Sequence, residues 1–495
     1  MTPFELWSTV VIFGPLLASV VALSARPALL RAGLVLGSLS ALVGSAGLWR
    51  AVILYGPGRH LLGGWGQPLG IELWIDGFGV AMLAVTALVG ALTSLYANSY
   101  FGDLSELSVR ESPAGRGARF FAPLWLLLWT ALNGIYLSAD LFNLYVTLEI
   151  LGLSAAAIVT LAVSRQATVA GMRYLLVSLI GSLLYLLGVA LLYVQYGTLS
   201  LEGLAAIGPS GPIPAIALAA MTVGMAAKTA LFPFHAWLPP AHAGAPAPGS
   251  AILSALVVKG SFFILVRLWF SVYGGGSPEG LVLLGVLGSG AILWGSVLAL
   301  RQVSLKRLIA YSTVAQLGYL FVMFPLLIPE PGLWNADAWT GGLLLAISHA
   351  LAKAAMFLAA GNMSYAVAQD RLTAISGVAH RLPMSFFAFG VGGLSLAGLP
   401  PSAGFVGKWL LLRSAFETAH WIWIAVIAVG GLLTIAYVLK VLRYALDRDE
   451  APEDFRPVPR RMEWAAALLA LAAMALGVRA LELVELLLVG GPFPW

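Results

Sequence analysis

The stretch TVGMAAKTALFPFHAWLPPAHAG, from Thr222 to Gly244, decides how this chain folds. It begins as an apolar helix that contains Lys228, then breaks at prolines and carries His235 and His242. Proline breaks free backbone groups, and inside a bilayer such a break is tolerated only where protein or a water-filled cavity surrounds it. An ionisable side chain beside such a break therefore predicts a polar site buried in a membrane.

The composition extends this prediction to the whole chain. Of its 495 residues, 60% are hydrophobic and only 10% are charged, against about 25% in a typical soluble domain. Apolar runs of about 20 residues recur along the full length, and their length predicts helices rather than alternating strands. The first run lacks the features of a cleaved signal and is predicted to span. The chain has no cysteine, so disulfides and thiolate ligation of iron–sulfur clusters are excluded. We predict an all-α polytopic membrane protein.

Fourteen stretches are long and apolar enough to be spanning helices. A Pro/Gly segment follows the seventh and another interrupts the twelfth. The spans are expected near 5–24, 33–54, 74–97, 120–138, 141–163, 170–195, 213–233, 248–272, 279–301, 307–327, 340–364, 384–418, 421–446 and 464–488.

Basic residues between the spans predict the orientation, because cytoplasmic loops carry the excess of Lys and Arg. Loops after even-numbered spans are nearly empty apart from Arg59, whereas loops after odd-numbered spans are basic. We expect both termini outside the cytoplasm, in the inner membrane of a bacterial or archaeal cell. The odd-numbered loops hold Arg26, Arg31, Arg110, Arg116, Arg119, Arg165, Lys306, Arg307, Arg371, Arg381, Arg448, Arg456, Arg460 and Arg461.

Two similar motifs indicate an internal repeat. LPPAHAG at Leu238–Gly244 is echoed by LPPSAGF at Leu399–Phe405, each at a break after the fourth span of a five-span block. An odd number of spans per block gives the blocks opposite orientations, and interrupted helices at matching positions are typical of a transport site. The expected division is 1–119 for spans 1–3, 120–272 for the first block, 279–446 for the second block and 464–495 for span 14.

Ionisable side chains in the middle of a span are rare and usually functional. Each costs about 2.5–3.5 kcal/mol at the bilayer centre, so five cost on the order of 10–15 kcal/mol, comparable to a domain's whole stability. Because buried lysine can release its proton near neutral pH and histidine titrates there, the set predicts a proton relay along the midplane. Its members are Glu149, Lys228, Lys259, Lys353 and Lys408, with His349 one helical turn before Lys353.

For some of these residues, and for the two histidines of the first break, a purely structural role is an alternative to a role in proton transfer. Lys228 has apolar residues on both sides, yet a lysine there can also snorkel to an interface. The depth of Lys408 depends on how far the second break reaches. His235 and His242 either hydrogen-bond the broken backbone or carry protons themselves.

The remaining polar residues predict no other chemistry. Arg267 is expected near an interface, Asp76 at the outer surface and Asp140 as the cap of the fifth span. GMAAKT lacks the glycines of a phosphate loop, and no haem-attachment, zinc or dinucleotide pattern occurs. We therefore expect no cofactor, no metal site and no catalytic residues.

Four segments carry a family resemblance. They are DLFNLYVTLEILGLSA around Glu149, AAKTALFPFHAWLPPAHAGAPAPGSAILSALVVKG around Lys228 and Lys259, SHALAKAAMFLAAG around Lys353, and LAGLPPSAGFVGKWLL around Lys408. They resemble the proton-translocating, antiporter-like membrane subunits shared by respiratory complex I, membrane-bound hydrogenases and Mrp-type multisubunit sodium/proton antiporters. The resemblance covers most of the chain.

The resemblance implies roles for the relay residues. Glu149 and Lys228 would act as a charge pair, Lys259 and the His349–Lys353 pair would extend the path, and Lys408 would end it. Lysine at this last position is closer to the D-type subunits of Mrp antiporters and the N-type subunits of complex I than to the M-type.

We expect the ion-translocating subunit of a multisubunit sodium/proton antiporter, working with other hydrophobic subunits, the lipid bilayer, protons and sodium, and without nucleic acid. The alternatives are the proton-pumping subunit of a redox complex, a non-conducting scaffold and a stand-alone solute transporter. None of these hypotheses makes the chain itself an enzyme, unless it works within a redox-driven translocase.

Overall fold

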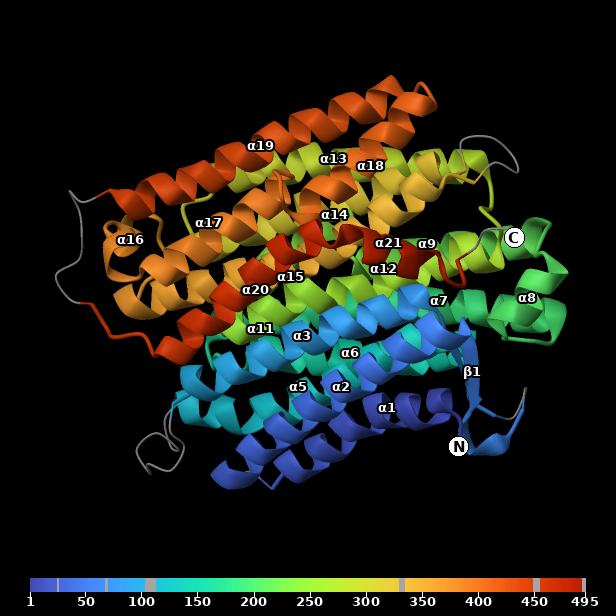
Figure 1. Ribbon diagram of the computed structural model, residues 1–495, viewed down its shortest axis with the longest axis horizontal. Coiled ribbons are helices and arrows are strands. Elements are labelled where there is room, and N and C mark those ends of the chain that lie inside the picture. Colours follow the sequence, from blue (N-terminus) through green and yellow to red (C-terminus); the bar gives the residue numbers. More distant parts are fainter. Residues whose placement is uncertain (25, 67–69, 103–112, 329–333, 448–454, 492–495) are drawn as a thin grey trace.

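The computed structural model describes residues 1–24, 26–66, 70–102, 113–328, 334–447 and 455–491, without the side chains of residues 113–116. Among them it is almost entirely helical, with one short hairpin, β1 and β2. Arg110 and Arg448, which we expected in basic loops, lie outside the described residues. The helices run side by side, from α1 and α2 along one edge to α19 along the other (Figure 1).

Twelve helices within the described residues are long and apolar enough to cross a membrane. The broken pairs α9–α10 and α17–α18 stand at the predicted seventh and twelfth spans. With η marking 3-10 and π turns, the elements are α1 Pro3–Ala22, α2 Pro27–Tyr55, β1 Gly58–Leu61, η1 Leu62–Gly64, β2 Glu72–Ile75, α3 Gly77–Tyr100, α5 Pro113–Leu137, α6 Leu141–Thr160, α7 Arg165–Tyr196, α8 Leu201–Ile207, α9 Pro212–Lys228, η2 Phe234–Trp237, α10 Leu238–Gly244, α11 Ala247–Ile252, η3 Leu253–Val257, α12 Val258–Val266, η4 Arg267–Val272, α13 Pro278–Arg301, α14 Leu305–Leu327, α15 Ala336–Val367, η5 Thr373–Ile375, α16 Val378–Arg381, α17 Pro383–Ala397, α18 Ala403–Glu417, α19 Trp421–Leu446, α20 Arg460–Val478 and α21 Ala480–Leu488.

The first break comes earlier than we predicted. We placed the end of the seventh span at residue 233, but α9 ends at Lys228. Ala230 takes a positive φ of 58°, which a helix cannot continue through, and Pro233 lacks the N–H group that a helix needs. Lys228 is therefore the last residue of its helix and stands at the edge of the break.

The eighth span contains an irregularity that the sequence pattern did not predict. Two π-helical stretches, η3 and η4, flank α12 within the continuous span Ala247–Val272. Single π turns inside α-helices are rare and occur frequently at functional sites. Lys259 lies two residues after the first of them.

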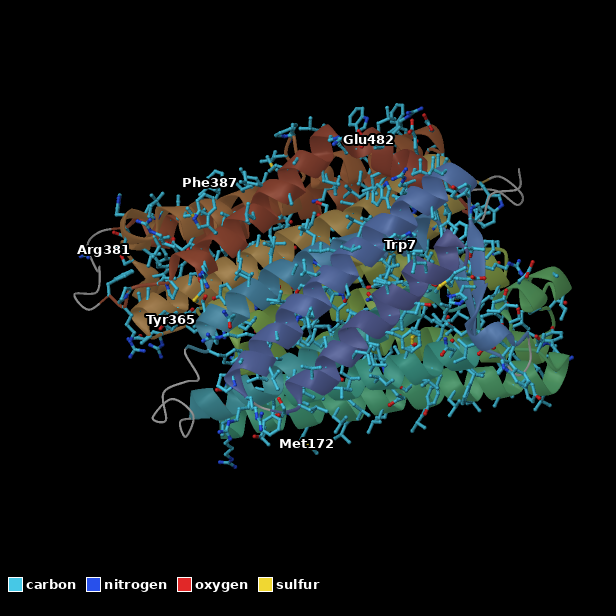
Figure 2. All side chains as sticks on the ribbon, turned by 60° about the horizontal axis from the view of Figure 1, so that its bottom comes forward. Trp7, Met172, Tyr365, Arg381, Phe387 and Glu482 are labelled. Atoms are coloured by element: carbon cyan, nitrogen blue, oxygen red, sulfur yellow. The ribbon has the colours of Figure 1, made fainter. Side chains whose placement is uncertain are left out.

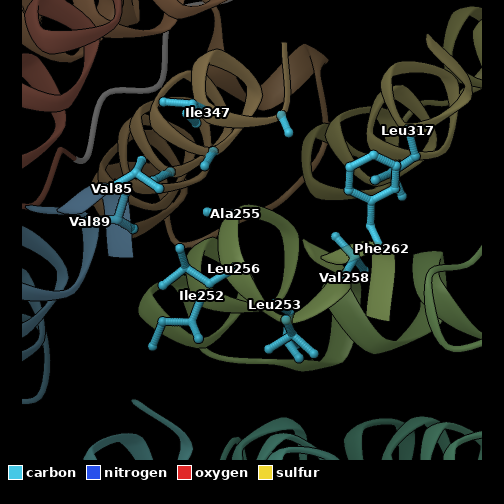
Figure 3. Close-up of a cluster of buried hydrophobic side chains, with 14 of the residues drawn as sticks. Val85, Val89, Ile252, Leu253, Ala255, Leu256, Val258, Phe262, Leu317 and Ile347 are labelled. Atoms are coloured by element: carbon cyan, nitrogen blue, oxygen red, sulfur yellow. The ribbon is translucent and has the colours of Figure 1, made fainter. Parts of the chain in front are cut away.

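The central helices are buried and the peripheral ones face outward. The most apolar windows of Ala247–Val272 and Ala336–Val367 are 100% buried, whereas that of Trp421–Leu446 is 33% buried. Figure 3 shows part of the centre, where Leu256 of the eighth span lies in one cluster with Val85 of α3 and Ile347 of α15. At the periphery apolar side chains such as Met172 and Phe387 point away from the protein (Figure 2). This is the pattern of a protein surrounded by lipid.

The hairpin and α8 lie at one end of the bundle and α16 lies at the other (Figure 1). At the hairpin end, Gly77 at the start of α3 donates its N–H to the carbonyl of Val489, just after α21. Asp140 caps α6 as predicted, accepting from the N–H groups of Phe142 and Asn143.

Asp76 was wrongly expected at the outer surface. Its side chain is 1% exposed and forms a double ion pair with Arg267, with both N–O distances 2.7 Å. Asp76 also caps α3, since its carboxylate accepts from the N–H of Gly79. Arg267 in turn lies over the ring of Phe263, 4.8 Å from the centroid. The pair ties the start of α3 to the far end of the eighth span.

Candidate functional site

Lys228 is held in a polar cage at the end of α9. Its ammonium donates to the Ser182 hydroxyl at 2.6 Å and lies 3.4 Å from the Ser178 carbonyl. Gly181 makes room for the lysine stem, because a Cβ there would come within 2.8 Å of Lys228 Cγ. Lys228 is buried, so the snorkelling alternative is wrong.

Glu149 lies beside this cage without touching the lysine directly. The Lys228 ammonium is 3.5 Å from the carbonyl of Leu148, the residue before Glu149. Glu149 Oε1 is buried and has no hydrogen-bond partner, and among the described residues no ion pair within 4.0 Å joins it to Lys228. The two groups still interact electrostatically. The structure thus leaves a gap between the two groups of the predicted charge pair.

Lys259 is completely buried at the centre of the molecule. Its ammonium donates to the Ser254 carbonyl at 2.7 Å, inside the π-helical stretch η3. The Ser254 hydroxyl is 2.8 Å from that of Thr313 on α14. This contact joins the eighth span to the tenth, at the boundary between the two predicted blocks.

His349 and Lys353 lie one turn apart on α15. The Lys353 ammonium donates to the Ile309 carbonyl at 3.1 Å and to the Ser312 hydroxyl. Among the residues that the structure describes, neither ring nitrogen of His349 has a hydrogen-bond partner, although the side chain is buried. His349 interacts electrostatically with both Lys259 and Lys353. It therefore lies between two lysines with its proton-carrying atoms unengaged.

The two histidines of the opening stretch have different surroundings. His242 is 1% exposed, stacks on Phe357 at 4.7 Å, and interacts electrostatically with Lys353, Lys306 and Lys259. His235 instead stacks on Phe232, with 5.7 Å between the ring centroids. The structure thus brings His242 into the lysine cluster and leaves His235 with the backbone of the break.

Lys408 occupies the second break. It lies on α18, and its ammonium donates to the carbonyls of Leu396 and Ala397 at 2.8 and 3.2 Å. Those carbonyls end α17 and have lost their helical partners. The ammonium also lies 4.2 Å from the centre of the Tyr319 ring. Lys408 is 6% exposed, so the break places it inside the protein.

A polar stripe on α14 extends between Lys353 and Lys408, and we did not predict it. Ser312, Gln316 and Tyr319 recur at i, i+4 and i+7, so they share one helix face. Ser312 contacts Lys353 and Tyr319 contacts Lys408. Gln316 between them donates to the hydroxyls of Thr434 and Tyr437 at 3.0 and 3.2 Å. Polar residues at helical spacing in an apolar span were the signal that could have found it.

The central lysines and histidines form a cluster of basic groups. His242, Lys259, His349 and Lys353 interact electrostatically, and among the described residues no ion pair within 4.0 Å joins Lys259 or Lys353 to a carboxylate. Because like charges in a low-dielectric interior repel, protonation of one member disfavours protonation of the next. No group of three acidic, histidine or cysteine side chains among the described residues could hold a metal ion. The arrangement is suited to passing protons along a row.

Comparison with known proteins agrees with this arrangement. Residues 138–434 match the family described as NADH:quinone oxidoreductase/Mrp antiporter, TM. The N subunit of the NADH-quinone oxidoreductase of Desulforudis audaxviator is 35% identical, over 81% of this chain and 78% of that one. The D subunit of the Na(+)/H(+) antiporter of Alkalihalophilus pseudofirmus is 29% identical, over 80% and 78%.

Solved structures share the fold almost end to end. A chain of the Mrp complex from Dietzia sp. superposes with a TM-score of 0.88 at 25% identity, covering 98% of this chain and 96% of that one. A chain of respiratory complex I from Thermus thermophilus gives 0.77 at 24% identity, covering 98% and 100%. The segment matched by the family includes Glu149, Lys228, Lys259, Lys353 and Lys408. With its helices, its breaks and its buried lysines in place, the chain belongs to the transmembrane NADH:quinone oxidoreductase/Mrp antiporter family.

Proposed function

We propose that this chain conducts protons within a multisubunit antiporter that exchanges monovalent cations, principally sodium, for protons. One observation carries the proposal, namely the row of buried ionisable and polar groups from Glu149 to Lys408. Two relatives named as the D subunit of a Na(+)/H(+) antiporter, at 29% identity in Alkalihalophilus pseudofirmus and 26% in Bacillus subtilis, support the antiporter assignment. Other hydrophobic subunits complete the complex.

The proposed mechanism is electrostatic. The negative charge of Glu149 stabilises the protonated form of Lys228 across the gap between them. When that stabilisation weakens, Lys228 releases its proton, which passes through hydroxyl groups and water to Lys259. Repulsion between the protonated groups of the central cluster then moves a proton onward to Lys353. The stripe on α14 then links Lys353 to Lys408. Each proton transfer makes the protonated state of the next group less stable, because like charges repel inside the protein, so protons move in sequence.

The two breaks support a repeated design. We propose that residues 120–272 and 279–446 are inverted five-helix blocks, with residues 1–119 and 464–495 flanking them. Each block contains a broken helix beside a lysine, Lys228 in one and Lys408 in the other. We propose that the hairpin end, with both termini, faces away from the cytoplasm and that the α16 end, with Arg371 and Arg381, faces it.

Membrane vesicles containing the assembled complex test this proposal. Lys228→Ala and Glu149→Ala should abolish proton-coupled sodium efflux while the complex still assembles. Arg173→Ala removes an exposed cation from α7, the helix that also supplies Ser182, and should leave the exchange unchanged. Normal exchange in Lys228→Ala vesicles would show that Lys228 is not part of a relay.

A second function is supported by a specific observation. The N subunit of NADH-quinone oxidoreductase from Desulforudis audaxviator is more similar, at 35%, than the antiporter relatives above. Under this alternative the same relay pumps protons in a redox complex. Subunits that co-purify with the chain discriminate the two, because small hydrophobic antiporter subunits support the first and iron–sulfur or quinone-binding subunits support the second.

A further inference from the structure

A polar pocket opens at the α16 end of the molecule, away from the relay described above. Its volume is about 350 Å³, and it lies where α14 begins and α15 ends. Tyr100, Ser364, Asp370 and Arg456 line it together with Lys306. The Ser364 hydroxyl is buried and makes no hydrogen bond within the described structure. Charged and hydroxyl groups on several elements therefore surround a space large enough for water.

Lys306 forms the inner wall of this pocket. It belongs to the first turn of α14, where its N–H donates to the Asp370 carboxylate at 3.0 Å. The Ser304 hydroxyl donates to the same carboxylate, so Asp370 holds the turn in place. The Lys306 ammonium points the other way and donates to the Ala245 carbonyl at 3.0 Å. The side chain thus extends from the pocket to the end of α10.

The end of α10 leads directly into the central cluster. Ala245 lies one turn after His242, and its N–H donates to the Ala241 carbonyl at 3.0 Å. His242 interacts electrostatically with Lys306 as well as with Lys259 and Lys353. Its Nδ1 is buried and has no partner in the described structure. Lys306 therefore links the pocket to the end of α10, where His242 lies.

We propose that this pocket is an aqueous mouth through which protons reach the relay, and that Lys306 is the residue that exchanges them between water and His242. The inference rests on the proposed function and extends it, because it assigns the point where protons come in. A proton from pocket water binds the Lys306 amine, and the ammonium then gives it up to His242, leaving a neutral amine. The charge balance is kept because each proton that leaves Lys306 is replaced from water.

Two sets of variants in the assembled complex test the proposal. Lys306→Gln removes the exchanging group and should slow proton-coupled transport at least about tenfold, as loss of a proton-transfer group does. Lys306→Arg keeps the charge and the contact with Ala245 but cannot release a proton, so it should be equally slow. Arg307→Gln changes the exposed neighbouring cation and should stay within about twofold of the unsubstituted complex. Full transport in Lys306→Arg would show that only the charge and the contact of Lys306 with Ala245 matter, and would overturn the proposal.

The absence of cysteine in this chain allows a direct test of water access. Gln369→Cys, at an exposed position that lines the pocket, should react with a membrane-impermeant, charged methanethiosulfonate applied at the α16 end, and the reaction should block transport. Arg307→Cys should react equally without blocking it, and Leu176→Cys, on the exposed apolar side of α7, should not react. A Gln369→Cys variant that reacts with the reagent and still transports normally would mean that protons do not enter through this pocket. As a control, the reagent should leave transport unchanged in the complex that contains the cysteine-free chain.

The relay variant separates this inference from the function on which it rests. If Lys228→Ala abolishes transport but Lys306→Gln and modified Gln369→Cys transport normally, the pocket proposal alone is contradicted. Normal transport in Lys228→Ala contradicts the proposed relay, while the effect of modifying Gln369→Cys on transport still shows whether protons pass through the pocket.

Discussion

Lys408 shows how a broken helix accommodates a buried charge. The helix α17 ends at Ala397, so its last carbonyls lack the N–H partners that a continuing helix supplies. Two of these carbonyls accept from the Lys408 ammonium, and the Tyr319 ring lies over it. The break therefore supplies hydrogen-bond acceptors where the charge needs them, and the charge satisfies backbone groups that would otherwise be unpaired.

The Tyr319 ring can be tested separately from its hydroxyl. Tyr319→Phe keeps the aromatic face under Lys408 and removes only a hydroxyl that has no hydrogen-bond partner in the described structure, so transport should be preserved. Tyr319→Leu removes the cation–π contact, worth about 2 kcal/mol when desolvated, and should lower transport clearly. The measurement is proton-coupled sodium efflux at matched complex levels. Equal activity of the Phe and Leu variants would contradict a role for the ring.

Ser182 offers a second test at the scale of single residues. Its hydroxyl is the closest partner of the Lys228 ammonium, at 2.6 Å. Ser182→Ala should leave a buried ammonium short of one acceptor and destabilise its charged form by about 1.5–3 kcal/mol. We expect the pH dependence of transport to shift in Ser182→Ala. The control is Thr86→Val, which replaces a buried polar side chain on α3 outside the proposed relay and should leave the pH dependence of transport unchanged. An equal shift in Thr86→Val would show that the shift in Ser182→Ala does not arise from the contact with Lys228.

The lysines were predictable at this scale and their partners were not. A charge in an apolar span is visible in sequence because it is costly there. Serine and carbonyl groups around Lys228 and Lys353 are ordinary in spanning helices, and only packing shows that they face an ammonium. Glu149 was predicted to pair with Lys228, but no spacing along the chain reveals that a gap separates them.

At the scale of elements, the eighth span is held at both of its ends. The π stretch η3 positions Lys259 near α14, and η4 carries Arg267 into its double ion pair with Asp76. The helical content of this span followed from its apolar run. The π turns did not, because hydropathy has the same pattern whether hydrogen bonds join residues four or five positions apart.

Breaking the Arg267–Asp76 pair should destabilise the protein strongly. Arg267→Met leaves the Asp76 carboxylate buried without a cation, which costs about 3–5 kcal/mol in comparable cases. Thermal unfolding of the purified complex, followed by tryptophan fluorescence, should show a lower midpoint. Arg413→Met removes an exposed arginine that pairs with Asp337 and Glu417, and should change the midpoint far less. Equal midpoints for the two variants would contradict the importance of the buried pair.

The hairpin is joined to α8 by a contact that should depend on pH. Arg59 on β1 lies 2.5 Å from Glu202 on α8 and 3.2 Å from Glu72 on β2. Its hydrogen bond lowers the pKa of Glu202. A lowered pKa in the folded state means that the contact stabilises fully above the unfolded value of about 4.3 and is lost as pH falls below it.

The Glu202 contact is checked by comparing melting midpoints at two pH values. Glu202→Gln should unfold at a lower temperature than the unsubstituted protein at neutral pH, and the difference should shrink as the pH falls below about 4.3. Because Glu202 is largely exposed, added salt should also reduce the difference. A difference that grows on acidification has the opposite sign and would contradict this account.

For the whole molecule, the central claim is that one path runs across both proposed blocks. The proposed relay would cross from one block to the other where the Ser254 hydroxyl meets that of Thr313, and it would continue along the face of α14 that carries Ser312, Gln316 and Tyr319. The spans and the two breaks could be predicted from hydropathy and the Pro-Pro echo. The crossing could not, because it depends on which face of α14 meets α15 and α19 in three dimensions.

The most direct test of this path leaves every lysine in place. Gln316→Leu replaces the amide between Lys353 and Lys408 with an apolar side chain of similar size, so the path should be interrupted without loss of charge. We predict that proton-coupled sodium efflux by the assembled complex falls as far as in Lys228→Ala, while Thr86→Val stays within about twofold of the unsubstituted protein. If Gln316→Leu transports at the unsubstituted rate, protons do not travel along α14 and the two blocks do not share one relay.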